Sequence, residues 1–459
     1  MSGFPIALGR LSKPKKRKGK GKAKSKARSR VRKATSAEYS MLLTATLCLL
    51  ALGAVMVFSA SSTTKVLSDG GLSDSAFYLK RTLLFGAVAL LAMHFVARTP
   101  NGLALVRRAT PLILGGSIFL LLVVLVAGNT VNGAKSWIGS GFVQVQPSEL
   151  AKVALILYCA DLLAQKPKRV RSIEGLTPFL LVAAGCGLLM MLQPDLGTMT
   201  VTAFGIGATL IAAGARPADL GKLGLGIGAL VLLLAIIEPY RMERLTSFLN
   251  PGGDIHGAGF QAAQAKIALG SGGLWGEGIG NGVQKAFYLP EAHTDMISAV
   301  IGEELGLIGI LGVVGLFGMF GYAGFKIAQK AKDNYGKVLV AGLTSMILVQ
   351  AIINLYAVMG MAPLTGVTLP FVSYGNSSLM VSLFAVGLIL NVARGGTAKA
   401  TAGSTSRAGK LRVVDGGGRS SSRERSRASG ARKAKGGGGG GGNRGARGAR
   451  HGGRRRASR

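Results

Sequence analysis

Windows of about 20 mainly apolar residues recur along this sequence, and a helix of that length crosses the hydrocarbon core of a bilayer. Irregular backbone cannot face lipid there, because no water is present to satisfy its amide and carbonyl groups. The sequence therefore predicts an all-α polytopic membrane protein. Ten transmembrane helices are expected, at residues 39–60, 77–96, 109–128, 148–165, 176–192, 198–214, 219–237, 296–325, 337–360 and 377–394.

The two ends of the chain differ from this apolar body. The chain has 459 residues and a net charge of +36, and most of its basic residues lie in segments 1–38 and 395–459. The first is rich in Lys and Arg and the second in Gly, Ser and Arg, so neither can bury enough apolar surface to offset its chain entropy. We expect two disordered cytoplasmic tails around a membrane domain at 39–394. The tails contain no folded nucleic-acid motif, so their predicted contacts are the membrane surface or protein partners, with no specific nucleic acid.

Basic residues in the short loops predict the orientation of the helices, because cytoplasmic loops carry an excess of Lys and Arg. Every second loop is basic, namely 97–108, 166–175, 215–218 and 326–336. With the basic N-terminus inside, this alternation places both termini in the cytoplasm. It also makes residues 238–295, between the seventh and eighth helices, a large extracytoplasmic loop.

Ionisable side chains also occur inside the predicted spans, where each costs on the order of 2.5–3.5 kcal/mol at the helix centre. Glu149 and Lys152 of PSELAK lie three residues apart, share a helix face and can form an ion pair. Asp195 of QPDLGT can cap the sixth helix or act as a second anion for Lys152. A structural network and a polar cavity both fit this set.

The large outer loop supplies cationic side chains. Arg241, Arg244 and Lys285 suit a phosphate or pyrophosphate group, and contact with anionic lipid headgroups is the alternative. The glycines between 270 and 282 permit tight turns and close approach of the backbone to a ligand. They do not form a nucleotide-binding fingerprint, because no strand–helix–strand unit surrounds them.

Acidic residues gather where this loop meets the eighth predicted helix, in FYLPEAHTDMISAVIGEELG. Asp295 can cap that helix, or it can act as a general base at the membrane–water boundary. We expect Glu291 and His293 to line the outer approach to it. Glu303 and Glu304 lie roughly 12–14 Å deeper along a helix that rises 1.5 Å per residue, so we expect them to form structural pairs.

The segment MAPLTGVTLPFVSYGNSS (361–378) is too apolar for a solvent loop, so we predict that it is re-entrant or packed over a groove. Ser373 and Ser377 offer neutral hydrogen bonds that suit sugar hydroxyls. The alternative is that Ser377 and Ser378 cap the tenth helix.

Seven blocks resemble the SEDS family of FtsW, RodA and SpoVE proteins over residues 40–394. They are FSASS (58–62), PSELAK (147–152), QPDLGT (193–198), GAGFQ (257–261), ALGSGGLWGEGIGNG (268–282), QKAFYLPEAHTDMISAVIGEELG (284–306) and LPFVSYGNSS (369–378). FSASS and QKAFYLPEAHTD are more similar to the division branch, FtsW, than to the elongation branch, RodA. One departure is Lys135–Ser136–Trp137, where the family has Arg before the Trp.

The resemblance implies a peptidoglycan glycosyltransferase with ten transmembrane helices, which polymerises lipid II on the outer side of the cytoplasmic membrane at the division septum. Asp295 matches the essential residue of the family, and Glu149, Lys152 and Asp195 match its cavity network. Gln261, at the end of GAGFQ, is expected among the substrate-binding residues.

The implied partners are lipid II, a class B penicillin-binding protein with FtsI-like transpeptidase activity, and other division proteins. A divalent cation (Mg²⁺ or Mn²⁺) between carboxylate and pyrophosphate fits this chemistry, although the sequence identifies no metal ligands. A lipid II flippase is one alternative, because intramembrane acids can mark a translocation path. The others are a RodA-like enzyme of cell elongation and a scaffold that recruits partners through its tails.

Overall fold

The computed structural model describes residues 19–68, 77–131, 134–139, 144–167, 170, 172–237, 248 and 258–396. The chain divides into the units Met1–Ala402 and Gly403–Arg459, and all described residues belong to the first. The predicted tail beyond residue 396, together with Arg241 and Arg244, lies outside the described residues.

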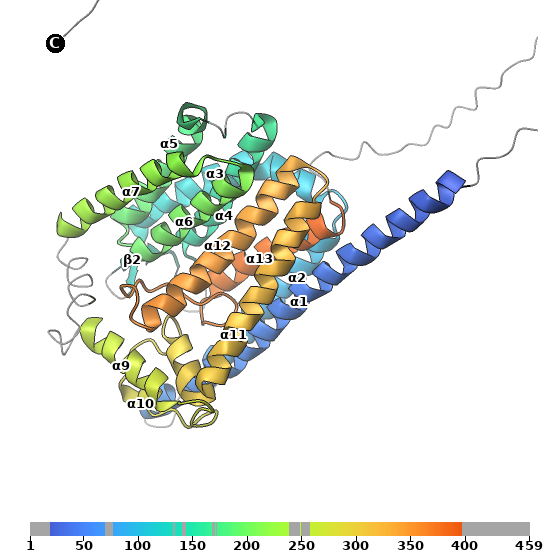
Figure 1. Cartoon of the computed structure of the whole chain (residues 1–459). Helices are drawn as coiled ribbons and strands as arrows, with labels where there is room; N and C mark the ends of the chain where they lie inside the picture. Colours follow the sequence, from blue (N-terminus) through green and yellow to red (C-terminus); the bar gives the residue numbers. More distant parts are fainter. Residues whose placement is uncertain are drawn as a thin grey trace, which may run out of the picture. The chain divides into compact units, whose positions relative to one another are not determined.

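Long helices form at all ten positions that the apolar windows predict (Figure 1). They are α1 (Gly19–Ser68), α2 (Phe77–Arg98), α3 (Gly102–Ala127), α4 (Pro147–Gln165), α5 (Ile173–Leu192), α6 (Leu196–Ala213), α7 (Pro217–Ile237), α11 (Ile297–Lys330), α12 (Asn334–Val358) and α13 (Asn376–Ala393). Within the described residues, eight are long and apolar enough to cross a membrane, and the other two are α4 and α7. The predicted polytopic helical class is therefore confirmed, whereas the count of ten spans stays a prediction.

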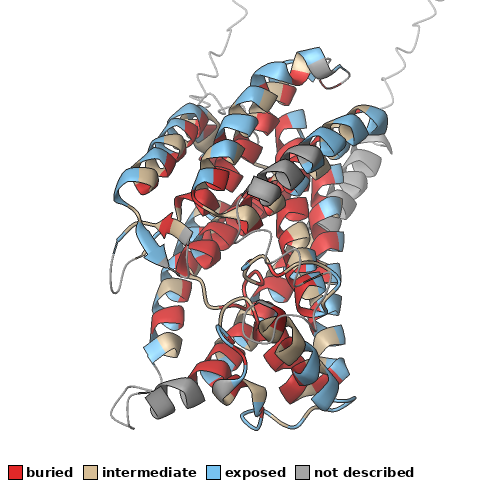
Figure 2. Cartoon of the chain, turned by 90° about the vertical axis from the view of Figure 1, so that its left-hand side faces the viewer, coloured by how far each residue is buried: buried red, intermediate tan, exposed pale blue. Residues whose placement is uncertain are grey.

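Helix α4 can contain charged residues because neighbouring helices shield their side chains from lipid. It packs against α3, α6 and α12, and most of its side chains are buried. Figure 2 shows that residues on the facing sides of the helices are buried, whereas residues on the outer sides of the bundle are exposed. The polar side chains of α4 therefore meet protein and not lipid.

Helix α1 begins at Gly19, inside the segment 1–38 for which the sequence predicts disorder. Ala, Lys and Arg have high helix propensity, and no proline occurs between Pro14 and the end of the helix. The apolar part of α1 that can cross a membrane is Ala37–Ser61. The basic residues before it therefore extend the first transmembrane helix.

The all-α prediction missed a short antiparallel hairpin between α3 and α4. Strands β1 (Asn129–Val131) and β2 (Ala134–Trp137) pair with Thr130 opposite Lys135. Asn-Gly at positions 132–133 is a strong hairpin signal, and the apolar windows on both sides obscured it.

The outer loop predicted at 238–295 also contains regular structure. Helix α9 (Ala258–Ser271) packs against α11, and a single turn, α10 (Gln284–Phe287), lies close to α1 and α9 (Figure 1). A glycine-rich turn joins the two.

The segment between α12 and α13 enters the bundle, as predicted. A Cβ atom on Gly53 of α1 would lie only 2.6 Å from the carbonyl oxygen of Phe371. Gly53 lies eight residues, or about 12 Å along the helix, before the end of the span Ala37–Ser61. The re-entrant segment therefore reaches well below the end of α1.

Helix α11 is interrupted at Gly306, whose φ of 66° and ψ of −164° are not helical. Glycine adopts positive φ at little steric cost. The backbone N–H groups of Leu307 and Ile308 donate instead to the carbonyls of Gly273 (3.0 Å) and Leu274 (3.3 Å) in the glycine-rich turn. A short helical part, 297–305, is thus separated from a long part, 307–330.

Candidate active site

A buried ion pair lies at the start of α4. Lys152 Nζ is 2.9 Å from Glu149 Oε1, and the two residues are 2% and 5% exposed. Lys152 also donates to Gln350 Oε1 of α12 at 2.9 Å. The predicted pair is confirmed, and its second partner is this glutamine rather than Asp195. Such a pair needs further hydrogen bonds to offset the loss of hydration, and Gln350 supplies one.

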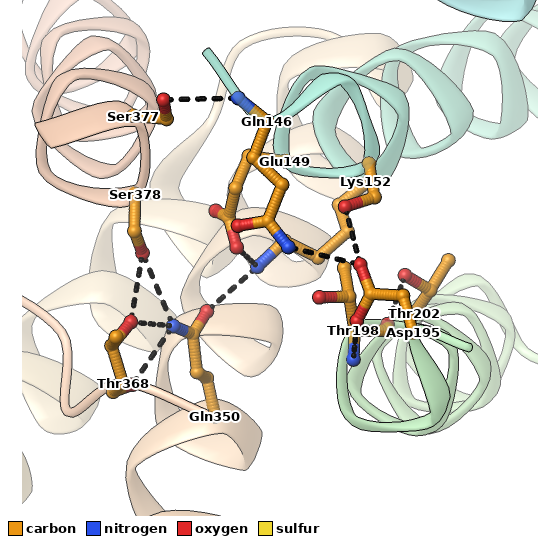
Figure 3. A network of polar contacts seen from close by, with 11 residues as sticks. Gln146, Glu149, Lys152, Asp195, Thr198, Thr202, Gln350, Thr368, Ser377 and Ser378 are labelled. Atoms are coloured by element: carbon orange, nitrogen blue, oxygen red, sulfur yellow. Dashed lines mark hydrogen bonds and ion pairs between the residues drawn. The ribbon is translucent and has the colours of Figure 1, made fainter. Parts of the chain in front are cut away.

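Gln350 extends this network to the re-entrant segment and α13. Its Nε2 donates to the carbonyl of Thr368 at 3.0 Å and to Ser378 Oγ at 3.3 Å. Figure 3 shows the resulting chain of contacts from Lys152 through Gln350 to Thr368 and Ser378. The start of α4, the outer part of α12 and the start of α13 are therefore joined through side chains.

Asp195 forms a neighbouring network at the start of α6. It accepts a hydrogen bond from the hydroxyl of Ser148 (2.6 Å). It also accepts from the amide of Gln146 (3.0 Å) and the backbone N–H of Thr198 (3.1 Å), as Figure 3 shows. The bond from Thr198 confirms that Asp195 caps α6. The other two bonds join the N-terminal ends of α4 and α6.

The serines before and within α13 form bonds inside the protein. Ser373 Oγ accepts from the N–H of Leu369 at 2.7 Å, and Ser377 Oγ accepts from the N–H of Gln146 at 3.1 Å. The N-cap of α13 is Gly375, which makes no side-chain cap bond, so the expectation that Ser377 and Ser378 cap the helix is wrong. The substrate contacts of Ser373 and Ser377 stay predictions.

Asp295 is half-buried at the start of the short part of α11. The N-cap is Met296 and makes no side-chain cap bond, so the structure does not support the capping interpretation of Asp295. Asn354 of α12 donates from Nδ2 to the carbonyls of Asp295 (2.7 Å) and Val367 (2.8 Å), and it accepts from Ser298 Oγ at 3.0 Å. This amide fixes the backbone of Asp295 to α12 and to the re-entrant segment.

Asn354 was not among the site residues predicted from the sequence. A lone asparagine within an apolar span was its signal, because such a group needs partners inside the protein. Gln350 lies one helical turn earlier on the same face of α12. Helix α12 therefore carries both the Lys152 network and the support of Asp295.

The carboxylate of Asp295 shares the hydroxyl of Thr294 with Glu291 and lies near the backbone of Gly366. Thr294 Oγ1 is 3.2 Å from Asp295 Oδ1 and 3.0 Å from Glu291 Oε2, and its single proton can serve one of them at a time. Gly366 has φ of 69°, and a Cβ there would lie 4.0 Å from Asp295 Oδ2. Glu291 itself has φ of 53°, a strained conformation of the kind that clusters at functional sites.

His293 packs into an aromatic cluster next to Asp295. Its ring centroid lies 4.4 Å from that of Tyr78 and 5.5 Å from that of Tyr374, and its carbonyl accepts from the N–H of Tyr374 at 2.9 Å. Burial lowers the pKa of His293, and the charge of Glu291 opposes this shift. The neutral imidazole therefore joins the start of α2 to the segment before α13.

Lys285, Glu303 and Glu304 form a structural cluster. Lys285 Nζ lies 2.5 Å from Glu304 Oε1, their side chains are 1% and 0% exposed, and Ser59 of α1 also donates to Glu304. Glu303 accepts from the N–H groups of Val283 (2.7 Å) and Gln284 (3.0 Å). The predicted structural pairing is confirmed for Glu304, whereas Glu303 binds backbone N–H groups.

Two related expectations are wrong. Lys285 cannot point outward to a pyrophosphate, because its ammonium group is buried against Glu304. Glu303 and Glu304 do not lie deep in a continuous span either, because α11 breaks at Gly306. Glu304 accepts a hydrogen bond from Ser59, two residues before the end of the span Ala37–Ser61, which places it and the adjacent Glu303 near that end of the span.

Gln261 and Lys135 also have defined contacts. Gln261 Nε2 donates to the carbonyl of Pro290 at 3.3 Å, which joins α9 to the approach to Asp295. Lys135 Nζ donates to the carbonyls of Leu125 (2.9 Å) and Val126 (3.0 Å) at the C-terminal end of α3. This cation therefore stabilises a helix end through the helix dipole.

The described residues contain no group of three or more His, Cys, Asp or Glu side chains that could hold a metal ion. A divalent cation would therefore need oxygen ligands from a substrate in addition to those of Asp295 or Glu291.

Residues 39–397 match the family model of cell cycle proteins of the FtsW, RodA and SpoVE type. The chain belongs to this family. Among members of the FtsW/RodA/SpoVE family, stage V sporulation protein E of Bacillus subtilis is 43% identical to this chain over 366 residues. These residues cover 79% of this chain and 98% of that protein. It is 40% identical to a Trichlorobacter lovleyi protein named "Probable peptidoglycan glycosyltransferase FtsW", over 78% of this chain and 94% of that protein.

Solved structures of the FtsW/RodA/SpoVE family share the fold. A chain from a peptidoglycan synthase complex, described as coordinating polymerisation and crosslinking, superposes with a TM-score of 0.62 at 28% identity, over 77% of this chain and 96% of that one. The rod shape determining protein RodA of Thermus thermophilus gives a TM-score of 0.57 at 28% identity, over 77% and 95%. Identity is thus higher to the named SpoVE and FtsW proteins than to this RodA.

Proposed function

We propose that the protein is a peptidoglycan glycosyltransferase that polymerises lipid II at the outer face of the cytoplasmic membrane, with Asp295 as general base. The names of the FtsW relatives support the activity. The observation that carries the assignment of Asp295 is the hydrogen bond from Asn354 to its backbone carbonyl, from a side chain that also holds the carbonyl of Val367 next to Gly366. A preorganised carboxylate with open backbone opposite it suits the removal of a proton from a bound hydroxyl.

The reaction joins two lipid-linked sugars. The C4 hydroxyl oxygen of the acceptor attacks C1 of the donor, a new C1–O bond forms, and the bond from C1 to the pyrophosphate oxygen breaks. The hydroxyl proton passes to the Asp295 carboxylate, and undecaprenyl pyrophosphate leaves with the bonding electron pair. Glu291 and the neutral His293 lie next to this carboxylate and shape the approach of the sugar.

Stabilising the departing pyrophosphate requires positive charge. Lys152 and Lys285 are each paired with a buried glutamate, so neither is a pyrophosphate contact in this arrangement. Arg241 and Arg244 remain the proposed cationic contacts of the pyrophosphate. A divalent cation is a further proposal: it would neutralise the charge of the leaving group, and Asp295 and Glu291 would hold it together with phosphate oxygens.

The flippase alternative is less well supported. Translocation needs a polar path through the protein, whereas the networks of Lys152, Asp195 and Asp295 lie at the starts of α4, α6, α11 and α13 and the outer part of α12. The names of the FtsW relatives also favour a transferase.

For partners, we propose a class B penicillin-binding protein with FtsI-like activity and other division proteins. The similarity to a chain of a peptidoglycan synthase complex supports the first. A septal location is proposed from the similarity to FtsW proteins, and the multi-pass helical architecture supports the membrane location.

The test is polymerisation of purified lipid II by the full chain, with and without its penicillin-binding protein. Asp295→Asn and Asp295→Ala are expected to fold and to form no polymer, because neither can accept the proton. Glu277→Gln is a matched control, since it removes an exposed carboxylate of the outer loop without touching the site. Full activity of Asp295→Ala would exclude Asp295 as the base, and transport of lipid II across vesicles without polymer would favour the flippase.

A further inference from the structure

The glycine-rich turn between α9 and α10 exposes large apolar side chains. Leu274 is 62% exposed and Trp275 is 80% exposed, and Ile279 and Val283 are 58% and 63% exposed. Soluble surfaces rarely present such side chains together, and a cluster of them marks a contact with a membrane or a protein.

Backbone hydrogen bonds hold this turn against the break in α11 at Gly306. The carbonyls of Gly273 and Leu274 accept from Leu307 and Ile308, which begin the long part of α11. In return, the N–H of Glu277 donates to the carbonyl of Glu303 at 2.9 Å. Leu274 and Trp275 therefore cannot leave the break at Gly306 without the loss of backbone bonds.

The level of this break coincides with the outer boundary of the hydrocarbon core. From Leu307 to Lys326 the helix rises roughly 28 Å, which matches a core about 30 Å thick. Lys326 lies 5.6 Å from the ring of Tyr322, a cation and an aromatic residue of the kind found at the cytoplasmic boundary. Leu307 and Ile308, at the other end, are 47% and 50% exposed.

The exposed surface of the turn is thus continuous with the lipid-facing side of α11. Tryptophan concentrates at the level of the lipid headgroups, where its ring is partly in the apolar region and its N–H meets polar groups. The sequence has no Lys or Arg between Lys266 and Lys285, and Lys285 is buried. Contact with the bilayer therefore rests on apolar burial and needs no anionic lipid.

We propose that Leu274 and Trp275 anchor the glycine-rich turn in the outer leaflet of the bilayer, at the boundary between headgroups and acyl chains. This differs from the role that the sequence suggested for these glycines, the close approach of backbone to a ligand. The anchor also holds the end of the short helix 297–305, which begins two residues after Asp295.

Fluorescence can test this directly, because the chain contains two tryptophans, Trp137 and Trp275. The full-length Trp137→Phe variant leaves Trp275 as the only indole, and Trp275→Phe is the matched control. Both are reconstituted into phosphatidylcholine vesicles whose acyl chains carry bromine near the headgroup or near the chain end. Thermal unfolding of both variants verifies the fold, and the difference between wild type and Trp275→Phe gives the Trp275 signal independently of the first variant.

We expect quenching of Trp275 to be at least twofold stronger with bromine near the headgroup than near the chain end, and equal when anionic lipid is added. Efficient quenching by aqueous iodide with none by brominated lipid would overturn the proposal, because the turn would then face water. Protection from both quenchers would also overturn it, because a protein would then cover the turn. Quenching that requires anionic lipid would contradict the apolar basis of the contact.

Discussion

Replacing Asn354 by leucine should separate the positioning of Asp295 from the stability of the fold. The amide is 2% exposed and donates to two backbone carbonyls, those of Asp295 and Val367. Leucine has a similar volume and no donor, so both carbonyls lose their partner. An unsatisfied buried polar group costs about 1–3 kcal/mol, so we expect a loss of about 2–6 kcal/mol in the free energy of unfolding.

Asn391 provides a matched control at the opposite end of the bundle. It is 3% exposed, and its Nδ2 donates to the carbonyls of Val96 (2.8 Å) and Thr99 (2.9 Å). Asn391→Leu therefore removes the same two bonds to backbone carbonyls, away from Asp295, whereas Asn354→Leu also removes the acceptor of the Ser298 hydroxyl. Thermal unfolding of both variants in one detergent should show losses of similar size.

Lipid II polymerisation, normalised to folded protein, distinguishes the two variants. A displacement of about 1 Å at a catalytic group can cost roughly 100-fold in rate, so Asn354→Leu should lower kcat by about 10-fold to 100-fold with little change in KM. Asn391→Leu should keep kcat within about twofold of the wild-type value, because it touches no reacting group. Equal specific activities of the two variants would refute the positioning role and leave Asn354 as a structural residue.

Three further perturbations test the buried charges, the histidine and the glycine beside the carboxylate. Lys152→Met should destabilise the fold by about 3–5 kcal/mol because it leaves Glu149 charged and unpaired, and adding Glu149→Gln should restore part of the loss in thermal unfolding. Burial lowers the pKa of His293 below its ordinary 6.5. Its contribution to the stability of the fold is therefore fully present above pH 6.5 and falls as the pH drops below that value. His293→Phe should remove this pH dependence in unfolding scans from neutral to mildly acidic pH. Gly366→Ala should lower polymerisation activity more than Gly214→Ala, since both positions have positive φ (69° and 96°) but only Gly366 lies near the carboxylate of Asp295. Equal activity of the two variants would show that backbone strain alone matters.

Hydropathy and charge predicted the class of fold because the bilayer imposes one length and one polarity on each helix. The positions of α1 to α7 and α11 to α13 follow from those constraints. The ion pair of Glu149 and Lys152 was predictable for a similar reason, since residues three apart share a helix face.

Long-range contacts were not predictable in the same way. Glu303 and Glu304 were expected deep in the membrane because a continuous helix was assumed, and the break at Gly306 changes their level. Lys285 was expected to face an anionic substrate, although Glu304, 19 residues later, is its partner. Asn354 was visible in the sequence only as an asparagine within an apolar span, and its acceptors could not be predicted because they are carbonyls on other segments.

The position of α13 has a consequence for assembly of the protein in the membrane. This helix is 18 residues long, 89% of its apolar window is buried, and it starts with Asn-Ser-Ser. Its first turn needs hydrogen bonds from Gln146 and Gln350, and its sides pack against α2, α4 and α12. Such a segment gains little from entering lipid alone. We therefore expect α13, the last helix among the described residues, to insert against a bundle that the earlier helices have already formed, so that the site is completed only after α13 has been synthesised.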